Sequence, residues 1–142
     1  MKTLDHSLNL TSKTTLTISN DEDAIGTKRE LISFLSSEGF NVVPFDAAKN
    51  AMKFKESINN VQNNEIQKAF NITDLNSVYA LSLKYQYFKN LEGYSYRNFK
   101  VSVIDMNTGR VIMHGYDATE SNTTVKVILR KLAKKLAKLR VN

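Results

Sequence analysis

Apolar residues along the 142-residue chain recur at two spacings, one typical of strands and one typical of helices. In residues 6–18 they fall at nearly every second position, which predicts a strand. In residues 25–35 they recur every three or four positions, which predicts a helix. Residues 40–44 have the pattern of a short strand, and Pro44 prevents further pairing at its nitrogen. The start of the chain is therefore predicted to form a β-α-β unit.

Polar residues and glycine mark the ends of these elements. Ser12 and Lys13 interrupt the first strand pattern, which predicts a bulge or bend. Residues 21–23 are Asp-Glu-Asp, and acidic residues stabilise the N-terminus of a helix through its dipole. A calcium site is a weaker interpretation of this run, because the alternating ligand pattern of calcium loops is missing. Gly39 stands where a left-handed residue ends the helix.

Residues 46–70 have helical spacing with a break. Asparagine pairs at positions 59–60 and 63–64 favour caps and turns over a helix interior. The segment is therefore predicted to form two short helices. The second is expected to direct three apolar residues into the core, namely Ile66, Ala69 and Phe70.

Alternation is strongest in residues 78–88 and returns in residues 94–105 and 111–116. The turn between the last two segments contains Gly109, which is suited to a positive φ. These segments predict an antiparallel three-stranded meander. Its core is expected to contain Leu81, Leu83, Val101 and Val103.

The last predicted helix begins near Ser121 or Asn122, either of which is suited to cap it. Its apolar residues form one stripe: Val125, Ile128, Leu129, Leu132, Leu136 and Leu139. The β-α-β opening, the meander and this helix together predict an α+β fold, with helices packed on one face of a single sheet. The length fits one domain over residues 1–142.

Composition is that of an ordinary globular domain, with 42% hydrophobic and 24% charged residues. Cysteine is absent, which excludes disulfides, thiolate metal sites and a thiol nucleophile. No apolar run approaches the roughly 18 residues of a transmembrane helix. The polar residues 1–6 lack the apolar core of a signal peptide, so a cytoplasmic location is expected for the sequence as it stands. An exported protein that starts further upstream would instead be periplasmic or associated with the outer membrane.

The net charge of +6 is concentrated in the last predicted helix. Residues 126–140 contain seven basic side chains and no acidic one, whereas the rest of the chain contains 13 Lys and Arg and 14 Asp and Glu. One interpretation is a solvated outer face on a helix packed against its own sheet. The other is a positive face that attracts nucleic acid, an anionic membrane surface or an acidic protein. Its candidate contact residues are Lys131, Lys134, Lys135 and Lys138.

Catalytic patterns are missing. His114 lies three residues before Asp117, with Asp105 across the predicted hairpin, but no nucleophile motif accompanies it, so a surface histidine is the favoured interpretation. The scattered glycines form neither a phosphate loop nor a dinucleotide fingerprint. Two histidines without clustered carboxylates do not predict a metal site. We therefore expect a non-enzymatic protein without a cofactor.

The tyrosine-rich strand from residue 79 to residue 87 raises the alternative of a surface that stacks bases. Because its tyrosines and leucines share one face, a core role is favoured. Tyr94 and Tyr96, close to Gly93, are predicted to be exposed and available for a partner.

Three segments resemble a known group of proteins: residues 39–44 (Gly-Phe-Asn-Val-Val-Pro), the strand of residues 79–87, and residues 99–111 with their Asp-x-x-Thr-Gly turn. They resemble small bacterial envelope domains, namely the amino-terminal domain of TolB and the CsgG-like lipoproteins. The resemblance covers most of the chain from about residue 8. It implies an accessory or assembly protein of the cell envelope that acts through protein–protein contacts. The lipid-accepting cysteine of such lipoproteins is absent, and a cytoplasmic nucleic-acid-binding domain that uses the basic helix is the alternative.

Overall fold

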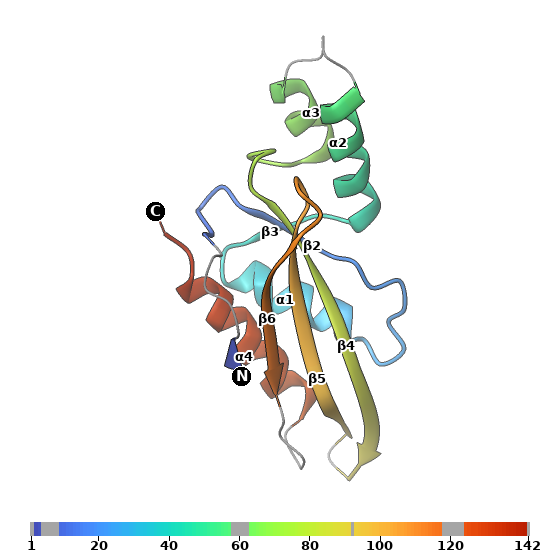
Figure 1. The fold of residues 1–142 in the computed structure, drawn as a ribbon. Coiled ribbons are helices and arrows are strands. Elements are labelled where there is room, and N and C mark those ends of the chain that lie inside the picture. The colour runs from blue at the N-terminus through green and yellow to red at the C-terminus, as the bar shows by residue number, and fades with distance from the viewer. Residues whose placement is uncertain (1, 4–8, 58–62, 92, 118–123, 142) are drawn as a thin grey trace.

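The computed structural model describes residues 2–3, 9–57, 63–91, 93–117 and 124–141 (Figure 1). Its elements, in chain order, are β1 (Lys2–Thr3), β2 (Thr15–Ile18), α1 (Thr27–Ser37), β3 (Asn41–Val42), α2 (Phe45–Ser57), α3 (Asn63–Phe70), β4 (Val78–Asn90), β5 (Gly93–Asp105), β6 (Val111–Asp117) and α4 (Val125–Lys138). The strands form one sheet in the order β1-β6-β5-β4-β2-β3. The predicted α+β class is confirmed.

The sheet combines the two predicted units. Strand β2 pairs in parallel with both β3 and β4, so the β-α-β opening is confirmed. Strand β3 lies at one edge of the sheet, and Pro44 follows it. Strands β4, β5 and β6 form the predicted antiparallel meander. The first strand is shorter than predicted, because the chain turns at residues 11–14, where the Thr11 amide donates to Thr14 Oγ1 at 2.8 Å. Residues 6–8 of that prediction lie outside the described part, and β1 was not predicted.

Helix α1 begins and ends where the sequence indicates. The carboxylate of Asp23 accepts hydrogen bonds from the amides of Lys28 at 2.7 Å and Arg29 at 3.2 Å. These are amides that the first helical turn leaves without intrahelical partners. Gly39 follows the helix with φ 89°, the left-handed conformation that glycine adopts without strain. The predicted role of the acidic run at a helix start is confirmed for Asp23.

The main core lies between the sheet and the two helices α1 and α4, which are behind the strands in Figure 1. The four predicted meander residues are all buried there, with exposed fractions of 0–5%. Helix α4 places the centre of its predicted stripe in the same core, namely Ile128, Leu129, Leu132 and Leu136. The opposite face of the meander carries neither α1 nor α4.

Helices α2 and α3 lie beyond one end of the sheet and pack around a second apolar cluster that includes Val78 (Figure 1). The prediction of two short helices is confirmed. Ile66 is buried and Phe70 is partly buried against the cluster, but Ala69 is exposed. The expectation that Ala69 reaches the core was wrong, because α3 has only eight residues and buries only its Ile66 side.

Candidate functional site

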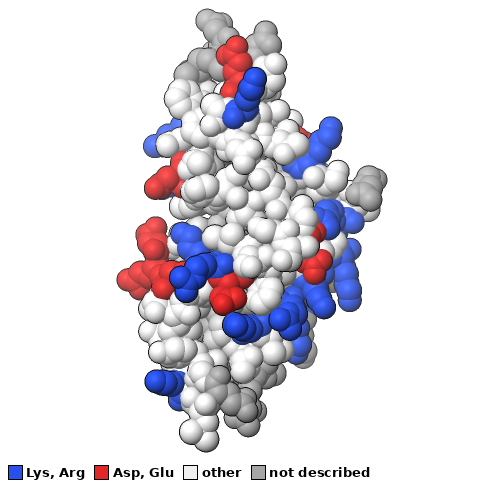
Figure 2. Space-filling view, turned by 180° about the vertical axis from the view of Figure 1, so that it is seen from behind, with Lys and Arg blue, Asp and Glu red and all other residues white. Residues whose placement is uncertain are grey.

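Helix α4 presents lysines to solvent on the side opposite its leucine stripe. Lys126, Lys131, Lys134 and Lys138 are exposed, and these four residues are called the basic face below. Figure 2 shows Lys and Arg side chains gathered along the side of the molecule that α4 forms. Lys135, the fifth lysine of the helix, is half-buried and makes a further contact. Three of the four predicted contact lysines are therefore fully accessible.

Two arginines of this segment make contacts within the molecule. The Arg130 guanidinium lies 5.2 Å from the ring centroid of Phe34 on α1. The Arg140 guanidinium lies 4.5 Å from the Phe40 ring centroid and donates to the Glu38 carbonyl at 2.6 Å. Cation–π contacts of this kind stabilise by about 0.5–1 kcal/mol at exposed sites. The arginines of this segment therefore contribute to packing, whereas the lysines of the basic face form a charged surface.

The acidic run of residues 21–23 forms a second charged surface, called the acidic corner below. All three side chains are exposed in the loop between β2 and α1. Figure 2 shows acidic side chains gathered on one side of the molecule and most of the cations of α4 on the other. The two regions approach each other where Ile25, Glu30 and Lys126 line one hollow. Within the described residues, no ion pair involves Asp21 or Glu22.

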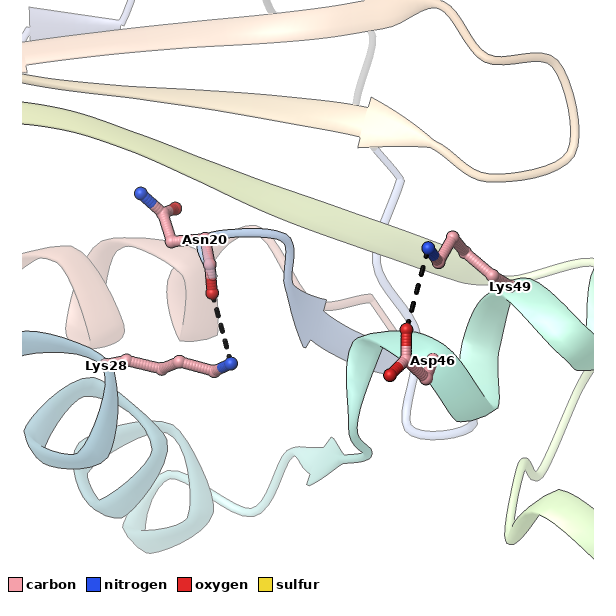
Figure 3. Close-up of polar contacts among 4 residues, drawn as sticks. All are labelled: Asn20, Lys28, Asp46 and Lys49. Atoms are coloured by element: carbon pink, nitrogen blue, oxygen red, sulfur yellow. Dashed lines mark hydrogen bonds and ion pairs between the residues drawn. The ribbon is translucent and has the colours of Figure 1, made fainter. Parts of the chain in front are cut away.

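Figure 3 shows two polar contacts that bear on the surface charges. Lys28 Nζ donates to the carbonyl of Asn20 at 3.1 Å, which holds one cation beside the acidic corner. Asp46 and Lys49 pair across one turn of α2 at 3.5 Å. Residues 21–30 contain four acidic and two basic side chains, so the corner keeps an acidic excess.

The β4–β5 hairpin ends in an apolar tip formed by Tyr87, Leu91 and Tyr94, called the hairpin tip below. All three side chains are exposed, and the two tyrosine rings meet edge to face with centroids 5.9 Å apart. The predicted exposure of Tyr94 is confirmed, with 41% of the residue accessible. Tyr94 and Lys126 line a common hollow of about 280 Å³, so the hairpin tip adjoins the basic face.

The predicted exposure of Tyr96 is wrong, because a β-bulge redirects its side chain into the core. The pairing of β4 with β5 shifts register next to Asn98, which has φ 56°. The extra residue brings Tyr96 and Phe99 to one face, with ring centroids 4.8 Å apart. Only 2% of Tyr96 is exposed, and its hydroxyl donates to Thr27 Oγ1 at 2.7 Å. Burial raises the pKa of this phenol far above its ordinary value.

His114 lies on the surface of β6, as predicted, and its Nδ1 is 3.2 Å from Ser102 Oγ. Asp105 instead accepts hydrogen bonds within its own turn, from the Asn107 amide at 2.8 Å. The side chain of Asp117 lies outside the described residues. No group of three or more potential ligands could hold a metal ion in the part of the chain that the structure describes. Across the same residues, no helix is long and apolar enough to cross a membrane.

Comparison with known proteins identifies solved structures with a similar fold. No protein-family model and no curated protein matches the sequence. Two solved structures of the PelC dodecamer from Paraburkholderia phytofirmans match 99% of this chain. The first, a single-substitution variant, has 16% identity, 97% coverage of PelC and a TM-score of 0.54. The second has 15% identity, 96% coverage and a TM-score of 0.51.

A third match is the lipoprotein GNA1162 from Neisseria meningitidis, with 14% identity over 88% of this chain and 96% of that protein. Bacterial lipoproteins are therefore among the structural neighbours, but the TM-score of 0.34 is too low to support an argument. The likeness to TolB and CsgG-like proteins stays a prediction. At identities of 15–16% the PelC likeness concerns the fold alone, and this chain has the fold of the PelC subunit.

Proposed function

We propose that this protein is a non-enzymatic subunit of a bacterial cell-envelope assembly and that it associates with copies of itself. The likeness to PelC, described as a dodecamer, carries the proposal, because the shared fold extends over nearly the whole length of both chains. The sequence resemblance to envelope accessory domains points to the same class of protein. In this proposal, the residues predicted to bind a partner bind a second copy of the chain.

The distribution of charge supports a head-to-tail arrangement of copies. A heterologous interface joins two different patches of the same protein, and it generates a closed ring when the rotation between neighbours closes. The basic face and the acidic corner are two such patches, and most of the basic face lies on the other side of the molecule from the acidic corner. The basic face of one copy would contact the acidic corner of the next.

The two kinds of surface would contribute differently to such an interface. Exposed ion pairs contribute only about 0.2–1 kcal/mol each, so the charges mainly orient the copies and set the salt dependence. Apolar burial contributes roughly 25 cal/mol per Å², and the hairpin tip, beside the basic face, supplies exposed apolar area. Tyrosine is also enriched in the cores of protein interfaces.

Native mass spectrometry of the purified chain tests this proposal. We expect a discrete oligomer at low ionic strength and a shift towards monomer as salt rises, because exposed charges are screened over about 10 Å at 0.1 M salt. A chain that stays monomeric at all protein and salt concentrations would contradict self-assembly.

The exposed lysines of α4 also favour one alternative, a cytoplasmic domain that binds nucleic acid. Replacing Lys131, Lys134, Lys135 and Lys138 with glutamine retains good helix formers. If α4 binds duplex DNA, wild-type affinity must fall with salt at a log–log slope of about −0.9 per phosphate contacted, and the variant must lose most of that slope. We expect weak binding by both proteins at physiological salt. Submicromolar binding that the four substitutions remove would favour the alternative.

A further inference from the structure

The meander has a hollow on the sheet face that α1 and α4 leave uncovered, the face turned towards the viewer in Figure 1. Its volume is about 650 Å³, within the range of roughly 300–1,000 Å³ typical of small-molecule sites. All three meander strands contribute to its lining, which among the described side chains includes Ser82, Lys84, Lys100, Val101, Ser102, His114 and Gly115.

Strand register places the polar side chains of the hollow in two adjacent rows. Ser82 pairs with Ser102, which pairs with His114, so two hydroxyls and an imidazole lie side by side across the sheet. Two residues further along β4, Lys84 lies directly opposite Lys100. Side chains two residues apart point to the same face of a strand, so both rows border the same hollow.

The facing lysines are unfavourable for the fold itself. Like charges directly opposite each other across two strands destabilise a sheet. Neither ammonium group has a hydrogen-bond or ion-pair partner among the described residues. Glu22 lines a neighbouring hollow with Lys84, but the two form no ion pair. An anion held between Lys84 and Lys100 would relieve their repulsion.

We propose that this hollow binds a phosphate monoester of a small molecule. A phosphate monoester approaches two negative charges at neutral pH, which two ammonium groups balance, whereas a carboxylate carries one. The Ser82 and Ser102 hydroxyls and the His114 imidazole supply hydrogen-bonding groups beside the charges. The volume leaves room for the organic part of the ligand next to its phosphate.

Titration of the full chain with glycerol 3-phosphate, followed by amide chemical shifts in NMR, tests the proposal. We expect saturable shifts centred on Ser82, Ser102 and His114. Replacing both Lys84 and Lys100 with glutamine should weaken binding at least about tenfold, and the matched pair Lys68→Gln with Arg110→Gln, outside the hollow and the basic face, should leave it unchanged. Inorganic phosphate should bind at the same place, and acetate at equal ionic strength should bind much more weakly.

The variant Lys100→Glu separates binding from folding. It places opposite charges across the strands, so we expect the thermal midpoint to stay level or rise while phosphate binding disappears. The proposal is overturned by shifts that do not saturate, by shifts centred on α4, by acetate binding as tightly as glycerol 3-phosphate, or by undiminished binding in the double glutamine variant.

Discussion

At the scale of single residues, one buried hydroxyl pair joins the sheet to α1. Tyr96 on β5 donates to Thr27, the first residue of α1, and both are almost completely buried. We expect Tyr96→Phe to reduce the free energy of unfolding by about 1–2 kcal/mol, because the Thr27 hydroxyl loses its buried partner. Urea denaturation checks this value. A variant as stable as wild type would show that the contact contributes nothing.

The raised pKa of Tyr96 predicts that the protein loses stability in alkaline solution. Burial raises the pKa of Tyr96 above its ordinary value of 10.0, so above pH 10 the unfolded chain releases a proton that the folded chain retains. Stability from this group is complete below pH 10 and falls as pH rises further, by at most about 1.4 kcal/mol per pH unit. Comparing the pH dependence of unfolding in wild type and Tyr96→Phe isolates this contribution. Parallel curves above pH 10 would contradict it.

The error over Tyr96 shows which residues limit prediction from the sequence. Alternation describes a regular strand, and one extra residue reverses the facing of every side chain beyond it. The available signal was Asn98, since asparagine adopts left-handed backbone conformations more readily than most residues. Tyr94 was predicted correctly as exposed because it lies next to the turn of the hairpin, before the bulge changes the facing of the strand.

At the scale of elements, the meander depends on side chains that β4 and β5 bury against α1 and α4. Leu83 is 5% exposed and lies in the main core. We expect Leu83→Ala to reduce the free energy of unfolding by about 2–5 kcal/mol, because a cavity adds to the lost transfer free energy. Denaturant unfolding measures the change. A loss below about 1 kcal/mol would mean that this strand does not face the core as described.

Elements with a continuous apolar pattern were predictable, and those defined by tertiary contacts were not. The stripe of α4 and the alternation of β4 each specify a buried face without reference to the rest of the chain. Strand β1 has only two residues and forms by pairing with β6, so no local sequence pattern predicts it. The position of α2 and α3 beyond the sheet likewise follows from packing around Val78.

At the scale of the whole molecule, the fold places the acidic residues 21–23 and most cations of the basic helix on different parts of the surface. The sequence showed the acidic run and the basic helix, but residues 21–23 and 126–140 are about 100 residues apart. Only the tertiary structure shows that most cations of the helix lie on the other side of the molecule from the acidic run. The row of hydroxyls and lysines on the open sheet face also arises from strand register, which joins residues of three separate strands.

Mixing two charge-reversed variants tests head-to-tail assembly most directly. One variant carries Lys126→Glu, Lys131→Glu, Lys134→Glu and Lys138→Glu, which reverse the whole basic face, and the other carries Asp21→Lys and Glu22→Lys in the acidic corner. Asp23 is retained because it caps α1. The control, Lys68→Glu with Arg110→Glu, reverses two cations at exposed positions away from both surfaces.

Each reversed variant has two sides of like charge, so we expect native mass spectrometry to find each one monomeric when alone. An equimolar mixture restores opposite charges at every interface and should form an oligomer in which the two variants alternate. The control should assemble as wild type does. An oligomer that forms equally well from either variant alone, or a mixture that stays monomeric while wild type assembles, would contradict head-to-tail pairing of these surfaces.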